Sequence, residues 1–287
     1  MTSTSALLRR SRLPVLLALS LVAAVFAAPA PVAAAETMTV SGAESAMVAA
    51  LNADRKAVGL IALQVDTRLM AIARARSVDM ATKNYFSHTQ PDGRNAFDLI
   101  SAAKITWYSA GEIIAWNNYP TLETSVQAAN SQWLNSPGHK KLIVSTSFNY
   151  VGVGLAVDAA SGKKYWTAVF IKGPDRTGAR ATTAAPSVTS GSTASTKKVT
   201  VSWSGADVPL QVLTSGFHSY KVQRRVDGGA WTTVWSSTTT RSMTLQLTLN
   251  HTYQFRVAAR DKAGNWGSWS TVQAKLAAPT GSAVVRR

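Results

Sequence analysis

Two histidines and one glutamate are the side chains of this sequence best suited to chemistry. His88 and His139 lie beside turn-forming residues, and Glu112 stands directly before the apolar run 113–115. An acid that leads into a buried segment is costly unless a partner neutralises it. Two imidazoles and a carboxylate could supply three ligands to a divalent cation and leave a fourth position open for water. The same groups could equally form a His–Glu–His hydrogen-bond network without a metal.

Other catalytic patterns are weak. The chain has no cysteine, which excludes thiol catalysis, disulfides and Cys-ligated zinc. Ser136 precedes His139 by three residues, but no strand–turn–helix elbow surrounds it. The run 151–154 lacks the rest of a dinucleotide-binding pattern, and no H-E-x-x-H motif is present. His218 and His251 start strand-like segments away from carboxylates and are expected to be ordinary surface residues.

Helical and strand-like patterns surround the candidate residues. Apolar spacing predicts four helices. The first covers 43–58, the second runs from a cap at Asp66 to about Lys83, the third covers 97–103, and the fourth runs from Leu122 to a stop near Pro137-Gly138. His88 and His139 are therefore expected in loops, after the second and fourth helices. Strands are predicted over 150–157 and 164–171, and the run 113–116 could add a third. This order favours a layered α+β domain.

The C-terminal part has a different composition. Residues 174–196 are rich in Thr, Ser, Ala, Gly and Pro and predict a flexible linker. Residues 197–277 contain short alternating strands and an Asp227-Gly228-Gly229 hairpin turn, which indicates an antiparallel sandwich. The motifs Val201-Ser202-Trp203, Tyr220-Lys221-Val222 and the run from Tyr253 to Trp269 resemble the fibronectin type III family. That resemblance implies an immunoglobulin-like all-β spacer or adhesive module.

Five motifs of the first domain appear in a specific order. They are Phe86-Ser87-His88-Thr89, Gly111-Glu112, the run from Trp133 to His139, Val151-Gly152-Val153-Gly154 and Tyr165-Trp166-Thr167. Together they resemble the CAP superfamily, which includes SCP-like and pathogenesis-related proteins, over Met47 to Phe170. The eukaryotic members contain disulfides, so a chain without cysteine resembles the bacterial members. The resemblance implies an α-β-α sandwich with a surface cleft.

The resemblance also implies a site. Many CAP domains hold two histidines and two acids that can bind a divalent cation, and His88, Glu112 and His139 match three of these positions. The fourth is Ser136 here, so the binding cleft is expected to contain these four residues. The three matching residues could hold one cation, zinc before others. Glu123 is an alternative acid, although its place in a first helical turn favours a role at the helix dipole.

The two ends of the chain carry separate signals. Arg9, Arg10 and Arg12, the apolar run 13–28 and Ala33-Ala34-Ala35 predict a cleaved signal peptide over 1–35, with no transmembrane segment in the remainder. The first domain is assigned to 36–173 and a basic tail to 278–287. Residues 176–287 carry 14 Lys and Arg against 3 Asp. This charge could favour an anionic cell-wall polymer, but the cations are scattered and no specific nucleic-acid motif is present.

Three functions remain open from the sequence. The first is a non-enzymatic extracellular or cell-surface protein whose cleft binds a small lipid-like or glycan-like ligand. The second is a metal-assisted hydrolase of a peptide or wall polymer, with His88 and His139 as ligands and Glu112 as ligand or base. The third is a purely structural or adhesive protein. The missing second acid favours the first.

Overall fold

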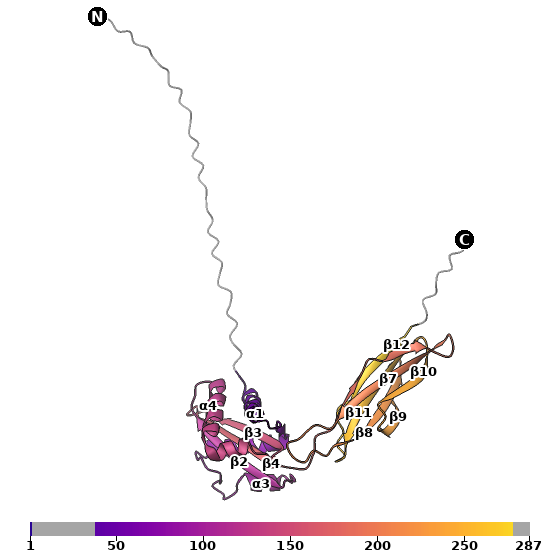
Figure 1. The fold of residues 1–287 in the computed structure, drawn as a ribbon. Helices are drawn as coiled ribbons and strands as arrows, with labels where there is room; N and C mark the ends of the chain where they lie inside the picture. Colours follow the sequence, from indigo (N-terminus) through magenta and orange to yellow (C-terminus); the bar gives the residue numbers. More distant parts are fainter. Residues whose placement is uncertain (2–37, 278–287) are drawn as a thin grey trace, which may run out of the picture. The chain divides into compact units, whose positions relative to one another are not determined.

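The computed structural model of this chain describes Met1 and residues 38–277 (Figure 1). The signal peptide predicted over 1–35 and the basic tail predicted over 278–287 lie outside the described residues, apart from Met1. Residues 38–277 contain a layered α/β domain followed by a β-sandwich, as the sequence predicts. None of the described helices is both long enough and apolar enough to cross a membrane.

The first domain contains five helices, and side chains cap four of them. The helices are α1 (Val40–Ala57), α2 (Thr67–Thr82), α3 (Ala96–Ala102), α4 (Leu122–Asn135) and α5 (Pro137–Ile143). The predicted Asp66 cap is confirmed, because its carboxylate accepts a hydrogen bond from the Arg68 backbone N–H. Thr39, Asn95 and Thr121 cap α1, α3 and α4 in the same way.

A four-stranded sheet forms the middle of the domain. Its strands are β1 (Gln64–Val65), β2 (Ser109–Asn117), β3 (Tyr150–Val157) and β4 (Lys164–Lys172), in the spatial order β1-β3-β4-β2. β3 and β2 pair antiparallel with β4, and β1 pairs parallel with β3. β2 is therefore an edge strand, and the predicted third strand is confirmed.

Helices cover both faces of this sheet. Trp166, Ala168 and Phe170 on β4 pack into the layer that contains α1 and α4, together with Trp133. The alternate residues Val169 and Ile171 pack against α2 and α3. Side chains alternate between the faces of a strand, so β4 supplies both cores and its sequence is a continuous apolar run. The predicted α-β-α sandwich is confirmed.

Two glycines of β3 allow the closest contact between layers. A Cβ atom on Gly152 would lie 2.1 Å from the backbone carbon of Leu69, and one on Gly154 would lie 2.1 Å from the backbone nitrogen of Arg74. Both neighbours belong to α2. The glycines thus let the α2 backbone rest directly on the sheet, which fixes the position of the residues on that helix.

The second domain is a two-sheet sandwich. Its strands are β5 (Arg180–Thr183), β6 (Ser187–Ser190), β7 (Thr196–Ala206), β8 (Phe217–Val226), β9 (Thr232–Thr238), β10 (Ser242–Thr248), β11 (His251–Asp261) and β12 (Ser270–Leu276). One sheet has the order β10-β7-β5, with β6 also on β7, and the other has the order β12-β11-β8-β9. Trp203, Tyr220 and Phe255 are buried between them. The predicted immunoglobulin-like sandwich is confirmed.

The predicted flexible linker at 174–196 is wrong in part. β5 and β6 lie within it and pair antiparallel with β7. Ala179 is fully buried in the sandwich core. The segment carries few large apolar side chains, but its Thr and Val residues suit an edge strand, and the ladder on β7 supplies partners for its backbone.

Candidate functional site

Glu112 lies at the centre of the predicted site and is already paired. It is on the edge strand β2 and is 7% exposed. Its Oε1 accepts a hydrogen bond from Arg76 Nε at 2.9 Å, and its Oε2 lies 2.6 Å from His88 Nδ1. Both carboxylate oxygens therefore have strong partners, and the buried charge is neutralised as its burial requires.

Arg76 is a site residue that the sequence patterns did not single out. It lies on α2 and its side chain is fully buried. It donates two further hydrogen bonds, from Nη1 to Tyr85 Oη at 2.9 Å and from Nη2 to the Ser87 carbonyl at 2.7 Å. Its signal was present in the sequence, because Arg76 follows Leu69 by seven residues and lies on the predicted apolar face of the helix. An arginine there needs an anionic partner.

Asp79 and Tyr85 extend the network towards solvent. Tyr85 donates from its hydroxyl to Asp79 Oδ2 at 2.6 Å. Burial alone would raise the pKa of Asp79, but hydrogen bonds from Lys83 and Tyr85 outweigh it and lower that pKa to about 2. Burial and the bond to Asp79 raise the pKa of Tyr85 to about 12. The segment before His88 is thus tied to α2 by charged hydrogen bonds.

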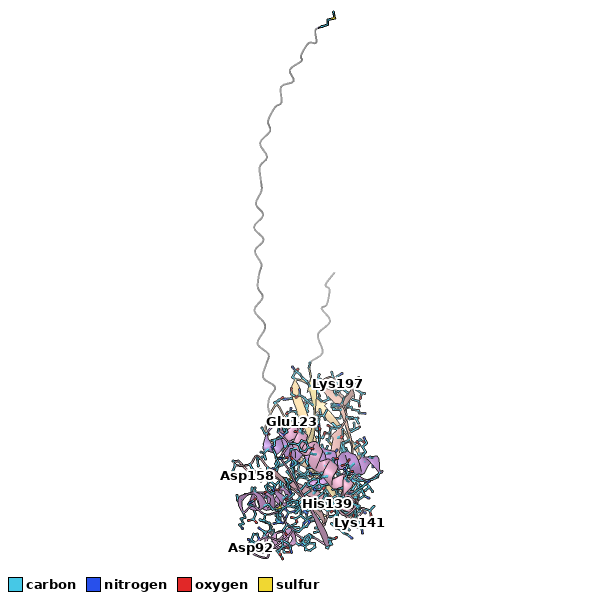
Figure 2. The ribbon with its side chains drawn as sticks, turned by 90° about the vertical axis from the view of Figure 1, so that its left-hand side faces the viewer. Asp92, Glu123, His139, Lys141, Asp158 and Lys197 are labelled. Atoms are coloured by element: carbon cyan, nitrogen blue, oxygen red, sulfur yellow. The ribbon has the colours of Figure 1, made fainter. Side chains whose placement is uncertain are left out.

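His139 is not in a loop as predicted. It is the third residue of α5, which begins at Pro137 immediately after α4 ends. Its side chain is labelled in Figure 2. Proline is favourable at this first position because its missing N–H is not needed there, so Pro137 starts a helix here as well as ending one. Burial, and then repulsion from His88, lower the pKa of His139. Neutral imidazole is therefore favoured at this position.

The four predicted cleft residues divide between two hollows. His88 and Glu112 line one of about 410 Å³, which borders α3 and α5. Ser136 and His139 line another of about 510 Å³, between β2 and α4. The alternation along β2 explains this division, because Ile113 and Ala115 face the α4 layer while Glu112 faces α2.

The three predicted metal ligands are not gathered at one point in the structure, and the metal site stays a prediction. Among the described residues, His88, Glu112 and His139 do not bring one ligand atom each within 4.8 Å of one another. The Glu112 oxygens are held by Arg76 and His88, and His88 uses its Nδ1 for that contact. Glu123 does not supply the missing acid, since it lies in the first turn of α4 and accepts from the Met38 N–H.

The larger hollow has a distinctive lining, and we call it the aromatic groove. Phe86, Trp116, Tyr119 and Trp133 contribute aromatic rings to it. Phe86, Trp116 and Tyr119 are exposed, whereas Trp133 is fully buried. Within the described part of the chain, the Trp133 indole N–H and Asn117 Oδ1 have no hydrogen-bond partner. Buried polar atoms without a protein partner are rare, and a buried water commonly satisfies them.

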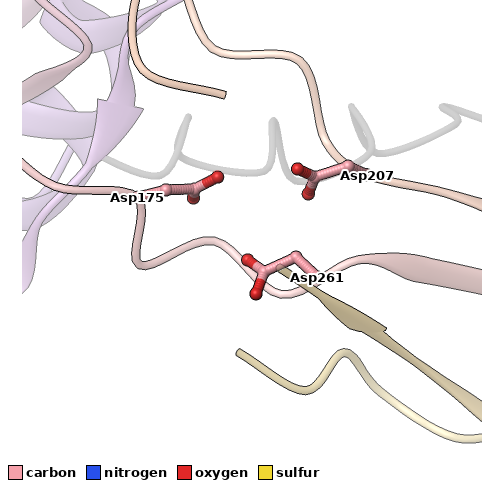
Figure 3. Close-up of side chains that lie close together, drawn as sticks. All are labelled: Asp175, Asp207 and Asp261. Atoms are coloured by element: carbon pink, nitrogen blue, oxygen red, sulfur yellow. The ribbon is translucent and has the colours of Figure 1, made fainter. Parts of the chain in front are cut away.

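Three carboxylates converge elsewhere, at one end of the sandwich. Oxygens of Asp175, Asp207 and Asp261 lie within 4.8 Å of one another (Figure 3). Each already accepts backbone N–H groups, for example from Ser215 to Asp175 and from Gly216 to Asp207. These hydrogen bonds give the cluster a structural role, because they hold neighbouring backbone segments together. No sequence pattern indicates it, because the three residues come from segments far apart in the chain.

The two remaining histidines belong to the sandwich. His218 Nδ1 lies 2.8 Å from the Ser219 hydroxyl. The expectation that His251 has no carboxylate nearby is wrong, because its Nδ1 lies 2.5 Å from Asp227 Oδ2. The β8–β9 turn returns Asp227 to the start of β11. Both groups of this pair are exposed, which makes it a surface contact of small energy.

The three-layer α-β-α domain, with His88, Glu112 and His139 around its edge strand, agrees with the SCP-like class that its sequence motifs resemble. Residues 48–170 match the sequence model of CAP, the Cysteine-rich secretory protein family. The chain therefore contains a CAP domain.

Two curated relatives come from Bacillus subtilis (strain 168). The chain is 40% identical over 152 residues to "Uncharacterized protein YkwD", covering 50% of this chain and 56% of that protein. It is 33% identical over 114 residues to "Uncharacterized membrane protein YlbC", covering 40% of this chain and 30% of that protein. The chain thus matches about half or less of the length of these relatives.

Solved structures resemble single parts of the chain. An extracellular protein containing a SCP domain from Bacillus anthracis is 31% identical, with a TM-score of 0.41, covering 46% of this chain and 41% of that chain. An outer surface protein from Borrelia burgdorferi is 21% identical, with a TM-score of 0.42, covering 47% and 96%. A human FNIII domain is 20% identical, with a TM-score of 0.28, covering 39% and 88%.

Proposed function

We propose that this protein is a secreted, non-catalytic binding protein. Its CAP domain holds a small hydroxyl-bearing ligand, glycan-like in chemistry, in the aromatic groove, and its sandwich acts as an adhesive spacer at the cell surface. The observation that carries the proposal is the lining of that groove. The exposed aromatic side chains of Phe86, Trp116 and Tyr119 lie there beside the exposed amides of Asn118 and Gln132.

The exposed amides of the groove favour a hydroxyl group. The side chains of Asn118 and Gln132 each offer N–H donors and an oxygen acceptor. A hydroxyl can both accept from and donate to such amides, whereas a carboxylate cannot donate and an alkyl chain can do neither. Ligand sites are commonly apolar clefts with a few such polar groups that fix orientation. A saccharide also offers apolar C–H faces to the exposed rings of Trp116 and Tyr119.

The charge beside the groove argues against a cationic ligand. Lys163 Nζ lies 3.9 Å from the ring centroid of Trp116 and 4.8 Å from that of Tyr165. Aromatic rings attract cations, but here a lysine already occupies that position. A neutral ligand avoids repulsion from it.

The engagement of Glu112 argues against catalysis. A general base or a metal ligand needs a free lone pair directed at its target. Here Arg76 and His88 each contact one carboxylate oxygen, and Glu112 is only 7% exposed, so little of the carboxylate is accessible to a substrate. The metal-assisted hydrolase is the alternative, and it would require this ion pair to open.

Secretion is supported by the leader predicted over 1–35. Basic residues, an apolar run and a small-residue site follow one another there in the order of a secretory signal. A chain without cysteine forms no disulfide in an oxidising compartment, so its two domains rely on packing for their stability.

The test follows the indole N–H resonance of Trp133 by NMR in the nitrogen-15-labelled full chain. The probes are neutral tetrasaccharides of glucose, of mannose and of N-acetylglucosamine, with palmitate as the lipid-like comparison. We expect one saccharide to shift this resonance in a saturable way. Trp116→Ala should abolish the shift and Tyr108→Ala, an exposed aromatic outside the groove, should not.

Two results would contradict the proposal. One is a saturable shift with palmitate and none with any saccharide. The other is tight one-to-one zinc binding that is lost in His88→Ala/His139→Ala, which would favour the hydrolase. Zinc titration by calorimetry is therefore run on the same samples, and no tight binding is expected.

A further inference from the structure

The outer face of the sandwich sheet β12-β11-β8-β9 carries a continuous row of cations and aromatic rings. Phe255 and Val257 of β11 point into the core, so the alternate residues Gln254, Arg256 and Arg260 point outward. Strand register places Gln223 opposite Arg256 and Arg225 opposite Gln254. We call the following set the cation face: Lys221, Arg225, Arg256, Arg260, Lys275 and the adjacent Trp231, Trp266 and Trp269.

Stacking holds the arginines of the cation face in place. Arg225 and Arg256 lie over the ring of Trp231, at 4.6 and 4.3 Å from its centroid. Arg256 also lies 4.3 Å from the centroid of Trp269, and Arg260 lies 5.6 Å from that of Trp266. An arginine stacked on a ring keeps its N–H groups available at its edge.

Two glutamines fix the arginine side chains further. Gln223 Oε1 accepts from Arg256 Nε at 2.8 Å, and Gln254 accepts from Arg225 Nε. Each guanidinium has five N–H donors, so several remain for an external acceptor. Side chains held in this way lose little conformational entropy when a ligand binds.

Among the sandwich residues that the structure describes, no acidic side chain belongs to this face. The 3 carboxylic side chains of residues 176–287 are Asp207, Asp227 and Asp261. Asp207 and Asp261 belong to the carboxylate cluster at one end of the sandwich (Figure 3), and Asp227 is paired with His251 in a turn. The cations of the face therefore repel one another, and an external anion would relieve that repulsion.

We propose that the cation face binds a linear polymer whose repeating units carry phosphate groups. Phosphate presents several strong acceptor oxygens that match a guanidinium edge. The stacked row across neighbouring strands offers repeated cations in sequence, which suits a chain of repeated charges. This inference concerns the sandwich alone and is independent of the ligand of the CAP domain.

A pair of matched double variants separates this face from net charge. Arg225→Gln/Arg256→Gln removes two charges from the stacked row. Lys197→Gln/Lys198→Gln removes two charges from β7, which belongs to the other sheet. Lys197 is labelled in Figure 2. Lys221→Gln/Lys275→Gln removes two charges of the cation face that do not belong to the stacked arginines. This variant replaces the arginine variant in the test if the latter does not fold.

Binding of linear polyphosphate to the full chain is measured by calorimetry, with neutral dextran as the control polymer. We expect the arginine variant to lose roughly tenfold or more in affinity and the β7 variant to lose less than about twofold. Wild-type affinity should fall steeply between about 50 and 200 mM salt, and less steeply in the arginine variant.

Three outcomes would overturn the proposal. Equal losses in the cation-face and β7 variants would mean that net charge alone drives binding. Failure of wild type to bind polyphosphate at low salt would remove the site. Binding to vesicles that contain phosphatidylserine, without binding to the polymer, would reassign the face to a membrane surface.

Discussion

At the scale of single residues, the ion pair between Arg76 and Glu112 organises the site. Arg76 joins α2, the His88 segment and the edge strand β2 through hydrogen bonds to a carboxylate, a hydroxyl and a carbonyl. It limits what Glu112 can contact, because Arg76 Nε holds Oε1 of that buried carboxylate. The same contact holds His88 against the sheet.

Arg76→Ala is expected to lower the free energy of unfolding by about 3–5 kcal/mol, because it leaves the buried Glu112 carboxylate without its cation. Urea unfolding followed by circular dichroism measures this. Arg94→Ala, which breaks an exposed pair with Asp92, should cause no measurable change. Arg76→Met/Glu112→Leu should be more stable than Arg76→Ala. A double variant as unstable as the single one would mean that packing, not charge, is lost.

Asp79 gives the site a pH dependence at its acidic end. Its pKa is lowered to about 2 in the folded chain by hydrogen bonds that outweigh burial, against roughly 3.9 in an unfolded chain. The stabilisation is therefore complete above about pH 4 and is lost as the pH falls towards 2. Asp79→Asn should be less stable than wild type at neutral pH, and thermal melts should show the difference narrowing below pH 4. A constant difference across this range would contradict the assignment.

At the scale of elements, the contact between α2 and β3 positions the charged network. The absence of side chains at Gly152 and Gly154 lets the helix backbone approach the strand closely. Arg76 and Asp79 are carried on that helix, so their reach to Glu112 and Tyr85 depends on how deeply α2 lies on the sheet.

Gly152→Ala and Gly154→Ala are each expected to destabilise the CAP domain by about 1–3 kcal/mol or more, because the new methyl group meets backbone atoms that cannot rotate away. Gly138→Ala is the matched control, since nothing lies within 4 Å of its added Cβ. It should stay within about 1 kcal/mol of wild type. Denaturant midpoints measure the stability of the three variants. Equal losses at the three positions would contradict the close contact as the cause.

At the scale of the whole molecule, charge and chemistry are divided between the two domains. The CAP domain carries the aromatic groove and a nearly balanced charge, with 13 Lys and Arg against 11 Asp and Glu over 36–175. The sandwich carries the excess of cations. The proposed functions follow this division, with a neutral ligand in one domain and a polyanion on the other.

Secretion is a prediction for the whole chain. Expressed in a bacterial host with a secretion pathway, the protein should accumulate outside the cytoplasm with its N-terminus near Glu36, after the Ala33-Ala34-Ala35 sequence. Intact-mass measurement of the secreted product checks this. Recovery of the uncleaved chain in the membrane fraction would mean that the leader acts as an anchor.

Local patterns in the sequence were enough to predict the element order and the fold class. Apolar periodicity located α1, α2 and α4, and alternating runs located β3, β4 and most of the sandwich, because these signals depend on local spacing. It also selected His88, Glu112 and His139, since polar residues beside buried segments stand out from their surroundings. The helix that starts at Pro137 and the strands within 174–196 were not predicted. Proline can end a helix or begin one, and a segment rich in Thr and Ser can be a linker or an edge strand.

The contacts of those residues follow from the tertiary structure. The partner of Glu112 is 36 positions away on another element, and no local pattern records such a pair. The division of the predicted cleft into two hollows follows from the side-chain alternation of an edge strand between two layers. The cation face likewise depends on register between β8 and β11, which brings scattered arginines and tryptophans into one row. Local spacing fixes elements, whereas contacts between distant elements depend on how their surfaces pack together.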